Sequence, residues 1–378
     1  MNGLQDHKKR KRYLKTHKNL FAKIVDINNL RSAIMHAAKG KRKRTEVIRV
    51  LQDVEGHALA LQEMLVNNTY TPCIYRQRTS TEGSSGKERL ITSIAFFPDQ
   101  CIHWAIILVM KPVIMGSSYN YSCGCMPNRG VHFGKRAIVK WLRNDRKHTK
   151  YCAKLDIRKY YQSIDHGRVI SYLERSIYDH RLMRLFKLII KSYEPGLPIG
   201  YLTSQWLGNF YLQGVDCMVK QDLKIKYYIR YMDDMVLFGP SKRKLHKAVK
   251  AIDGRLLDMG LQLKDNWQVF PLKHRALDFM GFRFYHHKTI LRRSLMLRIC
   301  RRVVKVWKKK KASFRDAAAI ISYMGWIRHS DSYGLYRDRI KPHVSIGKLK
   351  NIVRQQSLQE RDNNADRPGR IDGISPAA

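Results

Sequence analysis

Apolar residues in the middle of the chain follow two different patterns. Short apolar runs bounded by polar residues, at Cys152 to Ile157 and Tyr227 to Phe238, predict buried strands. Longer stretches with apolar residues three and four positions apart, from His166 to Tyr193 and from Ser241 to Met259, predict helices. The same spacing predicts a helix over Leu20 to Ala38. This mixture favours an α+β domain over a helical bundle or an all-β sandwich.

Two further segments flank this middle region. The polar stretch Thr79 to Gly86 predicts a hairpin tip between two extended pieces. After a predicted strand at Gly281 to Phe284, residues 291–311 carry ten Lys or Arg and no acidic residue. They predict a basic amphipathic helix whose incomplete apolar stripe packs inward. The stripe comprises Leu295, Leu297, Ile299, Val303, Val304 and Trp307.

Charge narrows the class of function. The 378 residues hold 73 Lys and Arg against 30 Asp and Glu, a formal charge of +43. Such an excess indicates a polyanionic partner and argues against an ordinary small-metabolite enzyme. No run of about 18 uncharged apolar residues occurs, so we expect no membrane span and no membrane partner. Seven scattered cysteines and no hydrophobic leader indicate a reduced, cytoplasmic compartment.

Three aspartates are the candidate catalytic residues. Asp233 and Asp234 interrupt the second predicted strand region and are expected at a tight hairpin turn. Asp156 lies at the end of the other predicted strand. If these strands are neighbours, the carboxylates converge, and oxygen ligands on rigid strands suit two Mg²⁺ ions ~3.5–4 Å apart that catalyse phosphoryl transfer. A plain Asp-Asp turn on a solvated hairpin is the alternative.

The residues around these aspartates resemble the reverse transcriptases. Tyr231-Met232-Asp233-Asp234 matches their YxDD box, and Leu155-Asp156-Ile157 with Tyr160-Tyr161 resembles their first catalytic motif. Four more blocks resemble motifs of the family and occur along the chain in the family's order. They are Lys87 to Ile91, Tyr121 to His132, Gly260 to Lys264 and Phe279 to Phe282. The resemblance covers roughly residues 20–350 and implies a right-hand polymerase with fingers, a palm built on a split βαβ antiparallel sheet, and a helical thumb.

The resemblance also implies individual roles. Asp156, Asp233, Asp234 and the backbone of Ile157 are expected to bind the two Mg²⁺ ions, for which Mn²⁺ can substitute. Nucleotide-binding residues are expected at Lys87, Arg89, Tyr161, Ile199, Gly200, Gln205 and Lys264. Among these, Tyr161 is expected to contact the sugar 2′ position, with a half-buried core tyrosine as the alternative. Lys264 is expected to be the general acid for pyrophosphate, with an ordinary exposed lysine as an equally fair reading. Nucleic-acid-binding residues on the basic helix are expected at Arg298, Arg301, Arg302 and Lys305.

One segment bears on the subclass. Where most of the family has P-Q-G-x-x-x-S-P, this chain has Ile199-Gly200 and Ser204-Gln205. That variant resembles the reverse transcriptases of diversity-generating retroelements, which copy a template RNA with errors at adenines. An aliphatic side chain beside the templating pair would discriminate less than an amide. The alternatives are a defence-associated, anti-phage reverse transcriptase and a non-catalytic RNA-binding module. A retron enzyme and a mobile group II intron protein are disfavoured, because the thumb V-T-G triplet and a maturase-sized extension are missing.

Together these features predict four segments and a set of partners. We expect a basic N-terminal extension over residues 1–19, fingers and palm over 20–285, a helical basic thumb over 286–350 and a disordered tail over 351–378. The expected function is RNA-directed DNA polymerase activity, error-prone and in a prokaryotic cytoplasm. The expected partners are template RNA, the RNA/cDNA hybrid, dNTPs and a small accessory protein.

Overall fold

The computed structural model describes residues 17–81 and 88–365, with only the helical backbone for 360–365. The chain divides into two compact units, Met1–Leu272 and Lys273–Ala378. We expected the boundary between palm and thumb at residue 285. The second unit begins about a dozen residues earlier, at Lys273. The expected basic extension lies outside the described residues up to residue 16.

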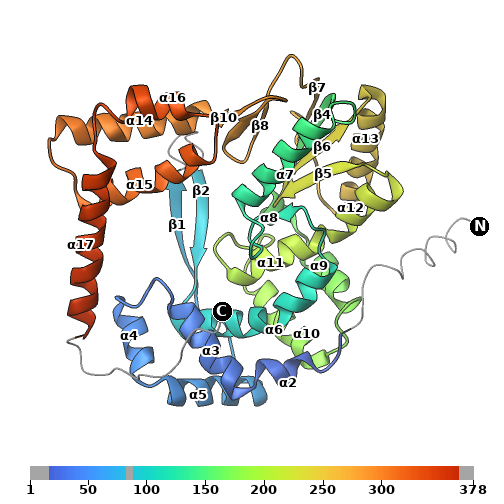
Figure 1. Ribbon diagram of the computed structural model, residues 1–378. Coiled ribbons are helices and arrows are strands. Elements are labelled where there is room, and N and C mark those ends of the chain that lie inside the picture. The colour runs from blue at the N-terminus through green and yellow to red at the C-terminus, as the bar shows by residue number, and fades with distance from the viewer. Residues whose placement is uncertain (1–16, 82–87, 366–378) are drawn as a thin grey trace, which may run out of the picture. The chain divides into compact units, whose positions relative to one another are not determined.

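A five-stranded sheet forms the centre of the first unit (Figure 1). Its order is β3-β5-β6-β4-β7, with β3 parallel to β5 and every other pair antiparallel. The strands are β3 (Ser122–Cys123), β4 (Tyr151–Asp156), β5 (Tyr227–Tyr231), β6 (Asp234–Gly239) and β7 (Gln268–Pro271). Helix α13 (Lys242–Asp258) packs against β4, β6 and β7. From β4 to β7 this is the split βαβ arrangement that was predicted, and the α+β polymerase fold is confirmed.

Helices and a separate hairpin complete the first unit. The hairpin pairs β1 (Arg76–Thr81) with β2 (Glu88–Ser93), as predicted, and its tip at 82–87 lies outside the described residues. The helices are α2 (Leu20–Ile24), α3 (Ile27–Ala38), α4 (Thr45–Gln52), α5 (Val54–Val66), η1 (Phe96–Gln100), α6 (Cys101–Ser117), α7 (Val131–Asn144), α8 (Tyr160–Ser163), α9 (His166–Glu174), α10 (His180–Lys191), α11 (Leu202–Tyr211), α12 (Gln213–Cys217) and η2 (Met218–Asp222).

Two predicted helices are each broken in two by an aspartate that caps the second piece. Asp26 separates α2 from α3 and accepts hydrogen bonds from the backbone N–H groups of Asn28 and Asn29. Asp179 precedes α10 and accepts one from the backbone N–H of Leu182. The helices on both sides of each break bury their apolar residues in the same core, so the apolar spacing continues across the break. The sequence alone therefore suggested single helices.

The segment Phe96–Ser117 is long and apolar enough to cross a membrane by length and composition. We expected no such segment, because Lys111 and Pro112 interrupt the apolar run. In the structure its main part, α6, packs against α2, α3 and α11. Ile102, Ile106 and Met110 are fully buried there, so the helix occupies a core position.

The second unit combines a small sheet with four helices. The sheet order is β10-β9-β8, all antiparallel. Its elements are β8 (Leu277–Phe279), β9 (Phe282–Phe284), β10 (Thr289–Leu291), α14 (Arg293–Lys308), α15 (Phe314–Arg328), α16 (Tyr333–Arg339) and α17 (Ile346–Ala365). Thr289 and Asp331 exchange hydrogen bonds of 2.7 Å, and the Phe282 ring lies 5.2 Å from Trp326. These contacts attach the sheet to the helices of the second unit. We expected a helical thumb from residue 286 onward, but this part of the chain also contains strand β10.

The predicted disordered tail is wrong for its first part. Helix α17 continues to Ala365 and packs against α15. Leu349 on α17 is buried, and no proline occurs between it and Ala365. The polar residues from Gln355 to Gln359 lie on a mostly exposed helix surface, while residues 366–378 lie outside the described part.

Candidate active site

The Asp-Asp pair lies at a tight hairpin between β5 and β6. Tyr231 and Asp234 are paired across the hairpin, which leaves Met232 and Asp233 as its two turn residues. Met232 has a left-handed backbone, with φ of 56°, a conformation suited to the twist of a two-residue hairpin. Its N–H donates to the Cys123 carbonyl at 3.0 Å. The turn is thereby tied to β3 as well as to its own strands.

A buried arginine holds this turn from behind. Arg230 is fully buried and forms an ion pair with buried Asp216 at 2.7 Å. The guanidinium also donates to the Met232 carbonyl at 2.8 Å and to the Asn209 side chain at 3.1 Å. Burial alone would lower the pKa of Arg230, but the Asp216 carboxylate raises it, so the group remains charged. We did not predict this network from the sequence, although an arginine between apolar strand residues was a visible signal.

The third aspartate lies directly opposite the hairpin. Asp156 ends β4 and is paired in register with Asp234 on β6, which puts both side chains on one face of the sheet. The Lys264 ammonium forms an ion pair with Asp156, and the Lys264 N–H donates to the Asp156 carbonyl at 2.8 Å. Ile157 follows and bridges to Leu263. Strand pairing therefore brings together the aspartates that lie far apart in the sequence.

The carboxylates carry an excess of negative charge. Burial and the neighbouring Asp156 raise the pKa of Asp233. Burial, Asp156 and Asp233 raise the pKa of Asp234 to about 6. Both shifts show that these charges are unfavourable in the absence of a further cation.

The donor set suits a hard divalent cation. Ion-pairing to Lys264 supplies a positive charge at Asp156, whereas burial and neighbouring carboxylates leave Asp233 and Asp234 unfavourably charged. Within residues 17–81 and 88–365, no three His, Cys, Asp or Glu side chains lie close enough together to hold a metal ion by themselves. Carboxylate oxygens with uncompensated charge are nevertheless the ligands that Mg²⁺ prefers, and further ligands come from water and substrate phosphates.

Two of the predicted nucleotide-binding residues act on the same carboxylates. The positive charges of Lys264 and Arg89 both favour the ionised form of Asp233. Tyr161, on α8, packs partly buried against the core, and its pKa is raised by burial and then by Cys125 and Asp233. The structure thus brings Arg89, Tyr161 and Lys264 to the aspartates. Lys87 lies outside the described residues.

The variant segment contacts the fingers hairpin through its backbone. The Ile199 carbonyl accepts a hydrogen bond of 2.7 Å from the Thr92 N–H on β2. Gly200 has φ of +127°, and a Cβ there would lie 2.0 Å from the Thr92 carbonyl oxygen. Only glycine permits this approach. Gln205, half-buried on α11, accepts at its carbonyl from the Asn209 side chain, which itself contacts Arg230.

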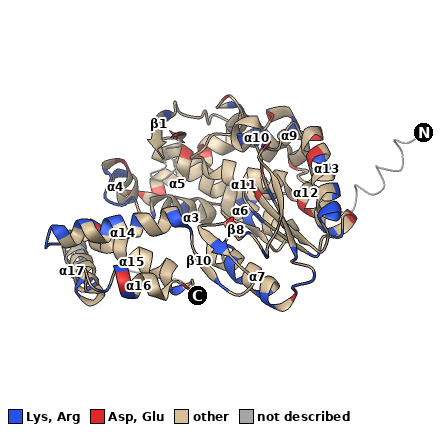
Figure 2. Cartoon of the chain, turned by 90° about the horizontal axis from the view of Figure 1, so that it is seen from above, with Lys and Arg blue, Asp and Glu red and all other residues tan. Residues whose placement is uncertain are grey.

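The four predicted nucleic-acid contacts on α14 divide into two kinds. Arg298, Arg301 and Lys305 are exposed, and Figure 2 shows Lys and Arg along this helix, which contains no Asp or Glu. Arg302 is instead paired with Asp316 of α15 at 2.5 Å, so its charge is already neutralised within the second unit. The buried stripe consists of Ile299, Val303 and Val306. Leu297, Val304 and Trp307, which we expected to pack inward, are exposed, because an i, i+4, i+7 row fills the contact with α15.

Comparison with known proteins agrees with this geometry. Residues 79–284, more than half of the chain, match the family described as reverse transcriptase (RNA-dependent DNA polymerase). Protein YkfC of Escherichia coli strain K12 is 24% identical over 308 residues, which cover 70% of this chain and 78% of YkfC. Group II intron-encoded protein LtrA of Lactococcus lactis subsp. cremoris is 26% identical over 204 residues, 51% of this chain but only 33% of LtrA. This chain belongs to the reverse transcriptase family and is an RNA-directed DNA polymerase.

Proposed function

We propose that Asp156, Asp233 and Asp234 are the catalytic carboxylates and that the enzyme is an error-prone reverse transcriptase of the diversity-generating retroelement type. The observation that carries the catalytic assignment is the register pair Asp156 and Asp234 beside the hairpin turn. The enzyme copies template RNA with dNTPs, forms an RNA/cDNA hybrid, and works in a prokaryotic cytoplasm with a small accessory protein.

Each residue has a defined task in this proposal. The three aspartates and the Ile157 carbonyl hold two Mg²⁺ ions, for which Mn²⁺ can substitute. When bound, these ions stabilise the charge on the attacking and leaving oxygens of phosphoryl transfer. Lys87 and Arg89 bind the triphosphate oxygens through charge-assisted hydrogen bonds. Lys264 donates a proton to pyrophosphate.

Selection among nucleotides is assigned to the residues around the nascent pair. Tyr161 excludes the ribose 2′ hydroxyl by its bulk. Ile199, Gly200 and Gln205 line the templating side. An aliphatic side chain cannot penalise a wrong hydrogen-bonding pattern as an amide can, because discrimination rests on differential binding of the transition state.

Primer extension tests the catalytic assignment. Asp233→Asn should abolish Mg²⁺-dependent dNTP incorporation while leaving RNA binding nearly intact, because only the metal-binding charge is removed. Asp265→Asn is the matched control, since this aspartate is 84% exposed and pairs with Arg158. Equal activity of Asp233→Asn and the parent enzyme would refute the catalytic assignment. If neither protein incorporated dNTPs, the alternative of a non-catalytic RNA-binding module would be favoured.

Sequencing of cDNA tests the subclass. Ile199→Gln should lower misincorporation opposite template adenine without eliminating synthesis. Leu257→Gln, at an exposed position of α13, is the control for an aliphatic-to-amide change. An identical adenine error rate in the Ile199→Gln variant and the parent would remove the physical support for the error-prone type. The defence-associated function would then be favoured, since some reverse transcriptases of that kind share the altered segment.

A further inference from the structure

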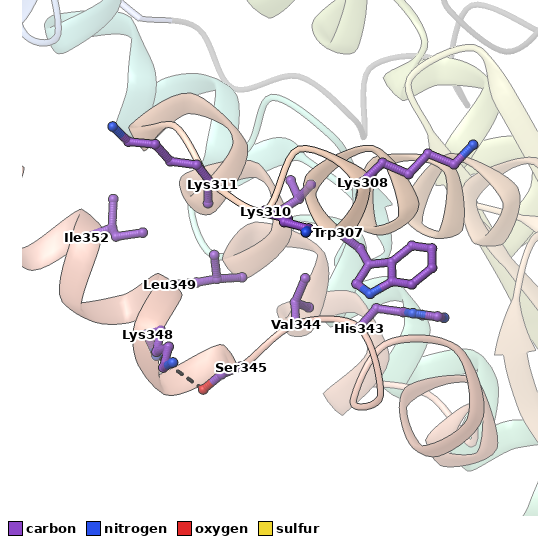
Figure 3. A pocket seen from close by; sticks show the side chains of 12 residues that line it. Trp307, Lys308, Lys310, Lys311, His343, Val344, Ser345, Lys348, Leu349 and Ile352 are labelled. Atoms are coloured by element: carbon purple, nitrogen blue, oxygen red, sulfur yellow. Dashed lines mark hydrogen bonds between the residues drawn. The ribbon is translucent and has the colours of Figure 1, made fainter.

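A cavity of about 860 Å³ lies within the second unit, at the end of α14 (Figure 3). Its walls come from the last turn of α14, the loop that follows it, the loop between α16 and α17, and the beginning of α17. Val306 and Leu349, both buried, contribute an apolar floor. A volume of this size accommodates a planar ligand of drug or nucleotide dimensions. Because every lining residue belongs to the second unit, the cavity is a property of that unit alone.

An aromatic pair forms one side of the cavity. The Trp307 and His343 rings lie 5.0 Å apart, tilted by 58° (Figure 3). Trp307 is nevertheless 51% exposed, although the neighbouring Val306 is buried. An indole that faces a cavity instead of the core offers a stacking surface that folding of the unit does not use.

Lysines contribute positive charge to the cavity that this aromatic pair lines. Lys308, Lys310, Lys311 and Lys348 line the cavity, and its lining contains no acidic residue. Lys310 has a left-handed backbone, with φ of 54°, and its N–H donates to the Trp307 carbonyl at 3.1 Å. Glycine would adopt this helix-ending conformation with less strain. The lysine at this position instead adds charge to the cavity.

We propose that this cavity binds single-stranded RNA, with one unpaired base stacked on Trp307 and the adjoining phosphates held by the four lysines. Aromatic faces flanked by cations are the usual chemistry of single-strand recognition, because every base has a π-face and every linkage a charge. A duplex does not fit this description, since its bases are stacked inside the helix. RNA is favoured over cDNA because polymerisation produces the cDNA already paired with its template, whereas uncopied template is single-stranded. The inference does not depend on the assignment of the catalytic aspartates.

Cross-linking gives a direct test on the full-length chain. A single-stranded RNA octamer carrying one 5-iodouridine is irradiated with the enzyme, and the cross-linked peptide is identified by mass spectrometry. We expect the label on Trp307 or His343. An excess of unlabelled oligoadenylate should abolish this label, whereas the same excess of an abasic ribose-phosphate octamer should compete poorly. Labels confined to the first unit would overturn the proposal.

Affinity measurements with matched variants give the second test. Trp307→Leu should weaken binding of fluorescent oligoadenylate by about 10-fold, as expected for one lost base–aromatic stack, and should leave binding of the abasic octamer unchanged. Tyr333→Leu is the control, because Tyr333 is an exposed aromatic residue that does not line the cavity. Equal affinities of the Trp307 and Tyr333 variants for oligoadenylate would refute the proposal and leave the cavity to an acidic peptide.

Charge variants preserve the aromatic pair and therefore separate binding from folding. Lys308→Gln with Lys348→Gln should weaken both octamers and reduce the salt dependence of binding. Lys350 lies on α17 like Lys348 but outside the cavity, so Lys350→Gln should change neither the affinities nor their salt dependence. Binding of an oligodeoxyadenylate octamer is measured in parallel to compare DNA with RNA. If the DNA octamer bound more tightly than the RNA octamer, the cavity would be assigned to cDNA and the proposal would be contradicted.

Discussion

Arg230 on β5 and Asp216 on α12 form an ion pair of 2.7 Å in which neither side chain is accessible to solvent. The same guanidinium donates to the carbonyl of Met232, the first residue of the hairpin turn between β5 and β6. The turn that carries Asp233 is therefore attached to a helix behind the sheet. This attachment compensates for the left-handed backbone of Met232, a conformation that costs free energy in a residue other than glycine.

Removal of this pair should be costly. Arg230→Leu leaves the Asp216 carboxylate buried without its cation, and we expect a loss of about 3–5 kcal/mol in the free energy of unfolding. Urea denaturation measures it. Arg31→Leu is the control, since the Arg31–Glu55 pair has two similar hydrogen bonds but lies on the surface, where ion pairs contribute little. Equal midpoints for the two variants would show that the buried network does not stabilise the turn.

The sequence predicted the parts of the site that rest on local order along the chain. Strands flanking Asp156 and the Asp233–Asp234 turn followed from apolar runs, and the structure pairs them as the split βαβ arrangement requires. Arg230 was not found, because its role depends on a helix fourteen residues earlier in the chain folding behind the strand. The prediction that Trp307 packs inward was wrong for a related reason. Helix α14 has several rows of apolar residues, and only its packing against α15 decides which row is buried.

Gly200 should tolerate no side chain. Gly200→Ala would put a Cβ 2.0 Å from the Thr92 carbonyl oxygen and would also strain a backbone with φ of +127°. We expect a loss of about 1–3 kcal/mol in stability and a marked loss of dNTP incorporation, because the variant segment would separate from β2. Thermal unfolding and primer extension measure the two effects.

A second glycine provides the matched control. Gly254 lies on α13, is exposed, and a Cβ there would meet nothing within 4 Å. Gly254→Ala should stabilise the chain by about 0.5–1 kcal/mol, since alanine loses less conformational entropy in a helix. If Gly200→Ala behaved like Gly254→Ala, the close approach to Thr92 would not constrain the site.

The ionised Asp234 carboxylate should oppose folding when a chelator keeps the proposed metal site empty. Its pKa is raised to about 6, above the value of about 3.9 in an unfolded chain, so the folded state binds the proton more tightly. The resulting stabilisation is complete below pH ~4 and is lost as the pH rises through about 6. Asp234→Asn should therefore raise the free energy of unfolding at pH 8 by up to about 3 kcal/mol, with a gain that shrinks below pH 6.

Thermal unfolding in EDTA at pH 8 and pH 5 checks this expectation. Asp265→Asn, at an exposed carboxylate, should shift neither midpoint appreciably. The same Asp234→Asn variant should lose polymerase activity, so gain of stability and loss of function would occur together. A variant no more stable than the parent at pH 8 would show that the carboxylate charge is not unfavourable in the folded chain.

The basic face of α14 should bind phosphates through three of its four predicted residues. Replacing Arg298, Arg301 and Lys305 with Gln should reduce the slope of log affinity against log salt by about 2–3, since each phosphate contact releases condensed counterions. The effect should be similar for every template sequence.

Arg302→Gln should behave differently, because Arg302 pairs with Asp316, which also receives a hydrogen bond from Ser313 at the start of α15. We expect that variant to lower the unfolding temperature and to leave the salt slope nearly unchanged. An unchanged slope in the triple variant would instead assign the exposed face of α14 to a protein interface.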